Sequence, residues 1–111
     1  MPSLQPSNAL ALAQVSLAAA SITSSYTLVG TFSSWLEILN LVNTTDAVLL
    51  ISFNGTTDHV TMPVGNTTPA IVPFNFKANL MTMPKTSIFV KTAGSATVGS
   101  ISANGFSSAT Q

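Results

Sequence analysis

The chain has 111 residues, no cysteine, and only three acidic and three basic residues, which leave it without formal net charge. This length predicts one domain, and the missing cysteine excludes disulfides and thiolate chemistry. Three scattered lysines without arginine argue against nucleic-acid binding, and no apolar run is long enough to span a bilayer.

The N-terminal part predicts an extended arm that leads into a first strand. Two prolines fall within the first eight residues, and we assign residues 1–12 to the arm. Residues 13–22 predict a strand with Val15, Leu17 and Ala19 on one face. Residues 26–32 alternate as a half-buried strand would, with every second residue on one face, namely Tyr26, Leu28, Gly30 and Phe32.

Residues 33–42 fit two structures. A helix would gather Trp35, Ile38, Leu39 and Val42 on one side, and Ser34 with Glu37 matches a capping box. A strand would instead place alternate residues together, namely Trp35, Glu37, Leu39 and Leu41. We favour the strand, because the helix would be short and strands are expected on both sides.

The middle of the chain predicts a hairpin and an edge strand. Residues 47–53 are almost all apolar, as in a central strand that is covered on both faces. Asn54 and Gly55 suit a tight turn, after which a return strand carries Val60, Met62 and Val64. In residues 70–76 alternate positions are again apolar, and Pro73 within them predicts an edge strand or a bulge.

The last third predicts a long connection and two closing strands. The connection at 77–85 holds Leu80, Met81 and Met83, and strands follow at 87–92 and 97–103. The total is about eight short strands, so we expect an all-β fold, a jelly-roll-like antiparallel β-sandwich with extended terminal arms. The single sandwich domain covers residues 13–106, and residues 107–111 form a C-terminal tail.

No catalytic or metal site is expected. His59 is the only histidine and Asp58 precedes it, but neighbours on an extended backbone point in opposite directions. We therefore interpret His59 as a turn residue that caps local backbone groups. The acidic residues match no metal-binding spacing, so the sequence predicts neither enzyme activity nor a cofactor.

The low charge instead predicts a protein that works inside an assembly. Charge is the usual device that keeps exposed strand edges from pairing with neighbours. We expect contacts with partner proteins through the N-terminal arm, Trp35 and the apolar connection. The residues chosen are Met1, Pro2, Leu4, Pro6, Trp35, Leu80, Met81 and Met83.

Four segments carry a resemblance to a known group of proteins. They are residues 21–32, 38–46 with the ending Asn-Thr-Thr-Asp, 51–59 reading Ile-Ser-Phe-Asn-Gly-Thr-Thr-Asp-His, and 84–91 ending Ile-Phe-Val-Lys. In this order the segments resemble small β-sandwich structural proteins of tailed bacteriophage virions. The likeness concerns turns rather than a catalytic signature.

The resemblance implies a capsid decoration (cement) protein on the virion surface, often trimeric, made in the host cytoplasm. Its partners would be the major capsid protein and copies of itself, with no nucleic acid and no membrane. Two alternatives stay open: a low-copy head–neck adaptor or fibre-base protein, and a secreted carbohydrate-binding β-sandwich module.

Overall fold

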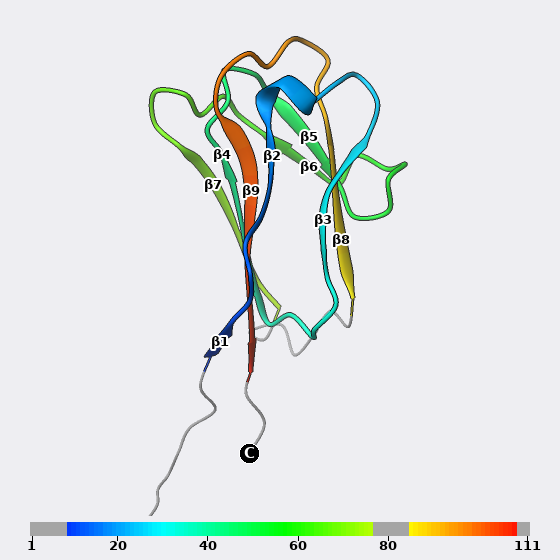
Figure 1. Ribbon diagram of the computed structural model, residues 1–111, viewed down its shortest axis with the longest axis vertical. Helices are drawn as coiled ribbons and strands as arrows, with labels where there is room; N and C mark the ends of the chain where they lie inside the picture. Colours follow the sequence, from blue (N-terminus) through cyan, green and yellow to red (C-terminus); the bar gives the residue numbers. More distant parts are fainter. Residues whose placement is uncertain (1–8, 77–84, 109–111) are drawn as a thin grey trace, which may run out of the picture.

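The computed structural model describes residues 9–76 and 85–108, and this part of the chain is an all-β sandwich (Figure 1). A short 3-10 helix, η1 (Ala19–Ser21), lies between two strands. The strands are β1 (Ala9–Ala11), β2 (Val15–Ala18), β3 (Thr27–Phe32), β4 (Ile38–Asn43), β5 (Leu49–Ser52), β6 (Val60–Met62), β7 (Ala70–Asn75), β8 (Thr86–Lys91) and β9 (Ser100–Ser108).

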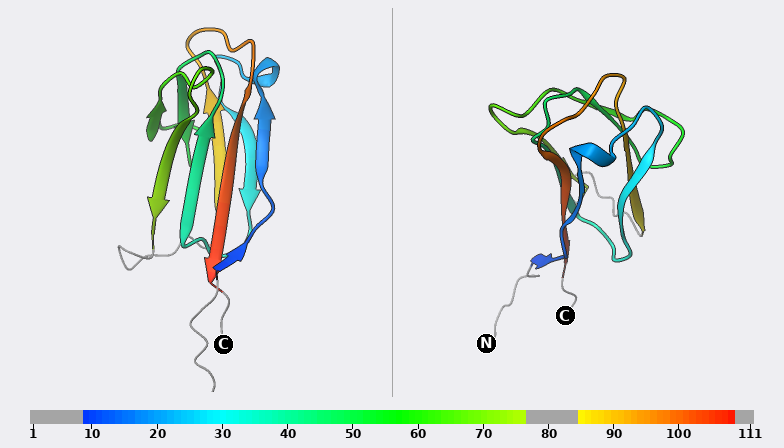
Figure 2. Two further views of the ribbon diagram at one scale, coloured as in Figure 1. Left: turned by 90° about the vertical axis from the view of Figure 1, so that its left-hand side faces the viewer. Right: turned by 45° about the horizontal axis from the view of Figure 1, so that its top comes forward.

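Two antiparallel sheets pack face to face (Figure 2). The first has the order β1-β9-β4-β7, and β2 pairs with the same strand, β9, as β1 does. The second has the order β3-β8-β5-β6. When β1 and β2 are counted as one interrupted strand, this order is that of a jelly roll, as the sequence predicts.

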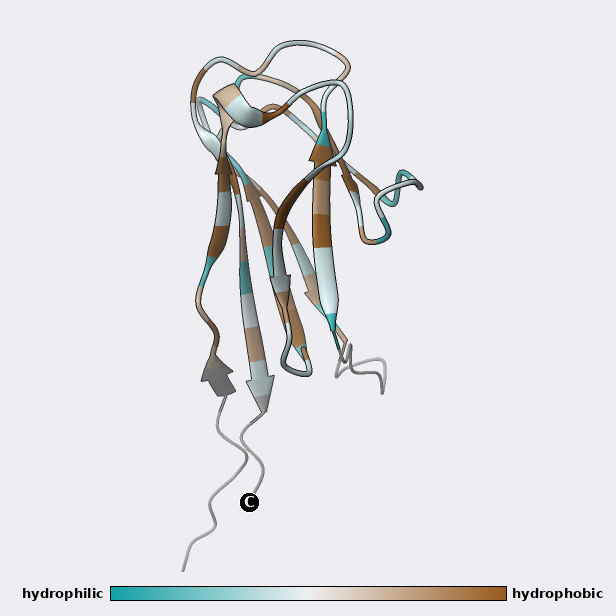
Figure 3. Cartoon of the chain, turned by 45° about the vertical axis from the view of Figure 1, so that its right-hand side comes forward, coloured by the Kyte–Doolittle hydropathy of each residue, from teal (hydrophilic) through white to brown (hydrophobic). Residues whose placement is uncertain are grey.

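The core lies between the sheets and is built from the inward residues of both. Leu39 and Leu41 of β4 face Leu49 and Ile51 of β5, and none of these side chains reaches solvent. Apolar stretches occupy the middle of the strands, whereas the connection after β5 is hydrophilic (Figure 3). Residues 33–42 contain no helix; the predicted strand begins at Ile38, and Leu36, rather than Trp35, is the buried residue before it.

Pro73 lies on β7, which among the described strands pairs with β4 alone and is therefore an edge strand, as predicted. The alternation predicted for residues 70–76 is also confirmed, because Val72 and Phe74 point inward while Ile71 is 59% exposed. β5 is a central strand, but its outward Leu50 is only half-buried.

A β-bulge corrects the face assignment for β3. The register with β8 shifts between Leu28 and Gly30, so that Val29 and Phe32 both point inward. The simple alternation of Leu28, Gly30 and Phe32 on one side is therefore wrong, because the bulge adds one residue to the strand.

The connection between β5 and β6 is longer than the tight turn expected at Asn54 and Gly55. Gly55 has a φ of +81°, in the left-handed region that glycine favours, but residues 53–59 all lie between the strands. The return strand ends at Met62, and Val64 lies beyond it, 45% exposed.

β1 pairs with the end of β9, with Ala9 opposite Ser108 and Ala11 opposite Phe106. This pair continues the first sheet toward the end of the molecule where β1 begins and β9 ends (Figure 1). Within the described residues, no helix has the length and apolar character needed to cross a membrane.

Candidate interaction surfaces

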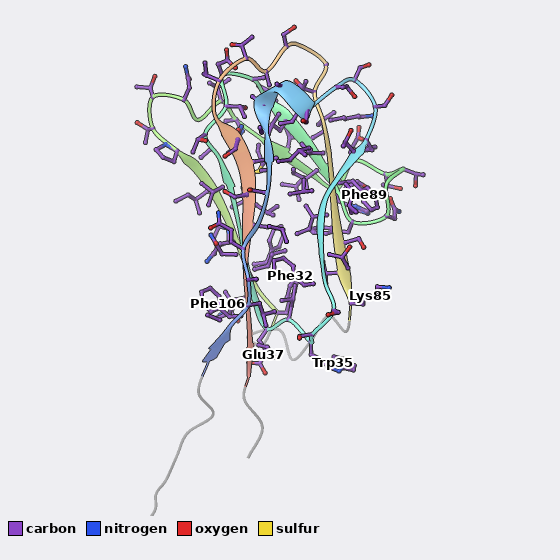
Figure 4. All side chains as sticks on the ribbon, viewed as in Figure 1. Phe32, Trp35, Glu37, Lys85, Phe89 and Phe106 are labelled. Atoms are coloured by element: carbon purple, nitrogen blue, oxygen red, sulfur yellow. The ribbon has the colours of Figure 1, made fainter. Side chains whose placement is uncertain are left out.

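Of the residues expected to contact partners, only Trp35 lies in the described part of the chain. It sits in the connection between β3 and β4, is 58% exposed, and points away from the sandwich (Figure 4). The other predicted contact residues lie outside the described residues, namely Met1, Pro2, Leu4, Pro6, Leu80, Met81 and Met83.

Among the described residues, none that points outward from the first sheet is charged, and we call this outer face the neutral face. The register of β2, β9, β4 and β7 sets which side chains point outward there. They are Ser16, Ala18, Ser100, Ser102, Asn104, Phe106, Ile38, Asn40, Val42, Ile71, Pro73 and Asn75. Figure 2 (left) looks onto this sheet, and no described connection crosses it.

Two amides lie side by side in the middle of the neutral face. Asn40 of β4 is the register partner of Asn104 of β9, and both side chains are half-buried. Among the described residues, neither side chain has a hydrogen-bond partner. An amide offers two donors and an acceptor, so this pair has unused hydrogen-bonding capacity at the centre of the face.

The outer face of the second sheet is different, because it is charged and partly covered. Lys91 Nζ lies 3.3 Å from Asp58 Oδ1 and 4.6 Å from the centroid of the Tyr26 ring. The Tyr26 hydroxyl donates a hydrogen bond to the same carboxylate. Asp58 thus ties the 53–59 connection to β8 and to the start of β3. The same connection lies close to the Phe89 ring, because a Cβ at Gly55 would stand 3.6 Å from it.

This cluster shifts the pKa values of two of its members. Burial, with the hydrogen bond to Asp58 and its charge, raises the pKa of Tyr26 to about 12. The same hydrogen bond lowers the pKa of Asp58, and Lys91 contributes in the same direction. Each shift favours the protonation state that holds the connection in place.

Asp46 ties together two connections at the opposite end of the sandwich from the start of β1 and the end of β9. Its carboxylate accepts hydrogen bonds from the Thr97 hydroxyl and from the Thr97 backbone N–H at 2.8 Å. The Thr97 hydroxyl and backbone N–H lower the pKa of Asp46. The connection between β8 and β9 is thereby fixed to the turn between β4 and β5.

A largely apolar pocket of about 450 Å³ opens beside this contact. Val48 and Val64 are both about half exposed at its rim, at 48% and 45%, and Leu50 contributes from the outer face of β5. The other lining residues are Asp46, Ala47, Thr92, Ala93, Gly94 and Ser95. A pocket of this size with a mostly apolar lining is within the range of small-molecule binding sites.

His59 caps backbone groups within its own turn, as predicted from the sequence. Its Nδ1 accepts a hydrogen bond from the Phe53 backbone N–H at 3.0 Å, and its backbone N–H donates to the Ile51 carbonyl at 2.9 Å. Within the described residues, no group of three or more histidine or acidic side chains is placed to hold a metal ion.

The turn motifs that carry the resemblance have structural roles. Asn43 Nδ2 donates to the carbonyls of Ala47 at 3.1 Å and Pro63 at 2.8 Å, while its Oδ1 accepts from the Thr45 N–H and hydroxyl. Asn54 Oδ1 accepts from the N–H groups of the next turn residues. These motifs therefore describe how the connections are built rather than where a ligand binds.

Neither the neutral face nor the pocket was predicted from the sequence. Outward positions without charge are visible in the sequence, but they gather on one face only once the strand order is known. The pocket draws on segments near residues 47, 64 and 93, which are distant along the chain.

Together these features define a jelly-roll β-sandwich with one uncharged sheet face and one charged, partly covered sheet face. Comparison with known proteins gives no match to a family model, to a curated protein or to a solved structure.

Proposed function

We propose that this chain is a non-enzymatic structural protein of a virion, and that it decorates and stabilises the capsid of a tailed phage. The observation that carries the proposal is the neutral face. On a free protein, this surface has no charge along four strands that would oppose association with other molecules. A protein that is built into a shell has partners to cover it.

The fold is consistent with this role. Jelly rolls are common in viral capsid domains, although they also occur in lectins, so the fold alone supports the proposal only by analogy. The turn motifs in residues 43–46 and 51–59 add the resemblance to phage virion proteins.

The proposed mechanism is burial of apolar surface between capsid subunits. Trp35 at one end and the pocket rim at Val48 and Val64 at the other offer exposed apolar groups at both ends of the sandwich. The residues beyond β1 and β9 would add strand pairing to a neighbouring subunit. Both kinds of contact work without charge.

The test is the amount of this protein in purified particles of the virus that encodes it. Quantitative mass spectrometry should find it at a copy number comparable to that of the major capsid protein. A copy number far below that value would support a head–neck adaptor or fibre-base protein instead. Absence from the particles would contradict both virion proposals.

The same particles test the contact residues. Particles made without the protein should rebind the purified chain, and deletion of residues 1–8 should lower the occupancy without changing the free energy of unfolding. Substitution Trp35→Ala tests the connection between β3 and β4 in the same assay, and Thr61→Ala on the outer face of β6 is the control. Unchanged occupancy in both variants would contradict this contact assignment.

A further inference from the structure

We infer that Asn54 is a site of self-modification, at which the folded chain converts its own asparagine to aspartate and isoaspartate. The reaction closes a ring between the Asn54 side chain and the backbone nitrogen of Gly55. Both residues lie in the hydrophilic connection after β5, and the Asn54 side chain is exposed (Figure 3). Glycine has no side chain to hinder the approach to its nitrogen. The inference does not depend on the proposed virion role.

A serine hydroxyl joins the two reacting groups. The Gly55 N–H donates a hydrogen bond to Ser52 Oγ at 2.8 Å, and the Ser52 hydroxyl donates to Asn54 Oδ1 at 2.9 Å. A hydroxyl with both contacts can accept the proton of the attacking nitrogen and pass its own proton to the carbonyl oxygen. Ser52 is fully buried, which holds this bridge in place.

Further donors surround the same carbonyl oxygen. Asn54 Oδ1 accepts from the backbone N–H groups of Thr56 and Thr57, both at 2.9 Å, and from the Thr56 hydroxyl at 3.1 Å. Donors that are already aimed at a carbonyl oxygen stabilise the negative charge that develops there during attack. The leaving nitrogen, Asn54 Nδ2, lies 3.2 Å from Thr57 Oγ1. The connection thus resembles a small acyl-transfer site that acts on its own residue.

The reaction needs only water as a second reactant. The Gly55 nitrogen bonds to Asn54 Cγ while its proton passes to Ser52, and the Ser52 proton passes to Oδ1. The Cγ–Nδ2 bond then breaks, the new hydroxyl gives its proton to the departing nitrogen, and ammonia leaves a five-membered succinimide. Water opens the ring at either carbonyl and yields aspartate or isoaspartate. Each event adds one negative charge to a chain without formal net charge.

The chain contains a second Asn-Gly pair, Asn104 and Gly105, which serves as an internal control. This pair lies within β9, and the Gly105 carbonyl accepts a hydrogen bond from the Leu12 N–H at 3.0 Å. A Cβ at Gly105 would stand 2.8 Å from the Leu36 side chain, so the backbone there is closely packed. Ring closure at Asn104 therefore requires β9 to leave the sheet.

The test follows both asparagines by peptide mapping with mass spectrometry, in the folded chain and in urea at mildly alkaline pH. In urea the two Asn-Gly pairs should react at similar rates. Folding should leave the Asn54 rate equal or higher, and should lower the Asn104 rate by more than about tenfold. A rate at Asn54 that falls on folding as far as that at Asn104 would overturn the inference.

Two substitutions test the contacts of Asn54. Ser52→Ala should slow the reaction at Asn54 in the folded chain by about tenfold and leave its rate in urea unchanged. A serine that only fixed the connection would give the opposite result, because its loss would free the connection and speed ring closure.

Thr56→Ala guards against a folding defect in Ser52→Ala, because Thr56 is exposed. It removes one donor to Asn54 Oδ1 and should slow the reaction about threefold. Thr61→Ala, an exposed threonine on β6, is its matched control and should leave the rate unchanged. Rates at Asn54 that are unchanged or higher in both the Ser52 and the Thr56 variants would overturn the inference.

Discussion

Asn43 is the residue on which the turn between β4 and β5 depends. It has no exposed surface, and its side chain hydrogen-bonds to residues of two different connections through Ala47, Pro63 and Thr45. Asn43 begins an Asn-x-Thr triplet, as does Asn66. Only the structure distinguishes the two residues, because Asn43 is buried and links two connections, whereas Asn66 is exposed.

We expect Asn43→Ala to lower the free energy of unfolding by about 3 kcal/mol, since it leaves buried backbone and hydroxyl groups without partners. Asn66→Ala, in an exposed turn, should change it by less than about 0.5 kcal/mol. Urea denaturation followed by tryptophan fluorescence gives both values. Equal effects would show that the Asn43 bonds contribute nothing beyond those of a surface asparagine.

At the scale of elements, the connection 53–59 shows what the sequence could and could not predict. Asn54 and Gly55 predict a turn there, and the His59 side chain caps the Phe53 backbone N–H of the same connection, as expected. The contact of Asp58 with Tyr26 and Lys91 could not be predicted, because it requires β8 to lie beside β3.

The β3 bulge has a similar lesson. The alternating letters of residues 26–32 suit a regular strand, and the extra residue emerges only from pairing with β8. A bulge arises where a strand carries one residue more than its partner, so the letters of one strand do not show where it falls.

The Asp58 contact predicts a pH dependence. The pKa of Tyr26 is raised from 10.0 to about 12, so the stability linked to Tyr26 is fully present below pH 10 and is lost as the pH rises toward 12. Asp46 and Asp58 have lowered pKa values, so their contribution is present at neutral pH and is lost in acid as the carboxylates become protonated.

Because Tyr26 is the only tyrosine, tyrosinate absorbance reports its titration directly. The midpoint should lie near 12 in the native chain. Asp58→Asn should bring it part of the way down toward 10.0, since it removes the carboxylate but not the burial. A native midpoint near the ordinary value would contradict the contact between Tyr26 and Asp58.

At the scale of the whole molecule, the two sheets close on each other where β2 meets β3. A Cβ at Gly30 would lie 2.5 Å from the Cβ of Val15, so only glycine leaves room for the first sheet to approach the second there. The fold class and the inward faces of β7 and β8 could be predicted from the alternation of apolar residues in the sequence. The close approach of Gly30 to Val15 could not be predicted, because these residues lie on strands of different sheets.

We therefore expect Gly30→Ala to destabilise the fold by about 1–3 kcal/mol, since the added methyl must push the backbone of one sheet away from the other. Gly94→Ala is the matched control, because a Cβ there would meet nothing within 4 Å. Thermal unfolding of both variants checks the difference. A Gly30→Ala variant as stable as Gly94→Ala would contradict the close packing of the two sheets at this edge.

The start of β1 and the end of β9 lie at the same end of the sandwich, while the β4–β5 and β8–β9 connections lie at the other (Figure 1). Residues of these two connections line the pocket. A reporter domain attached directly before Ala9 or directly after Ser108 would consequently lie at one pole. The far pole, with its pocket, would stay unobstructed, so a labelled chain shows by the position of its label which way up it sits on a surface.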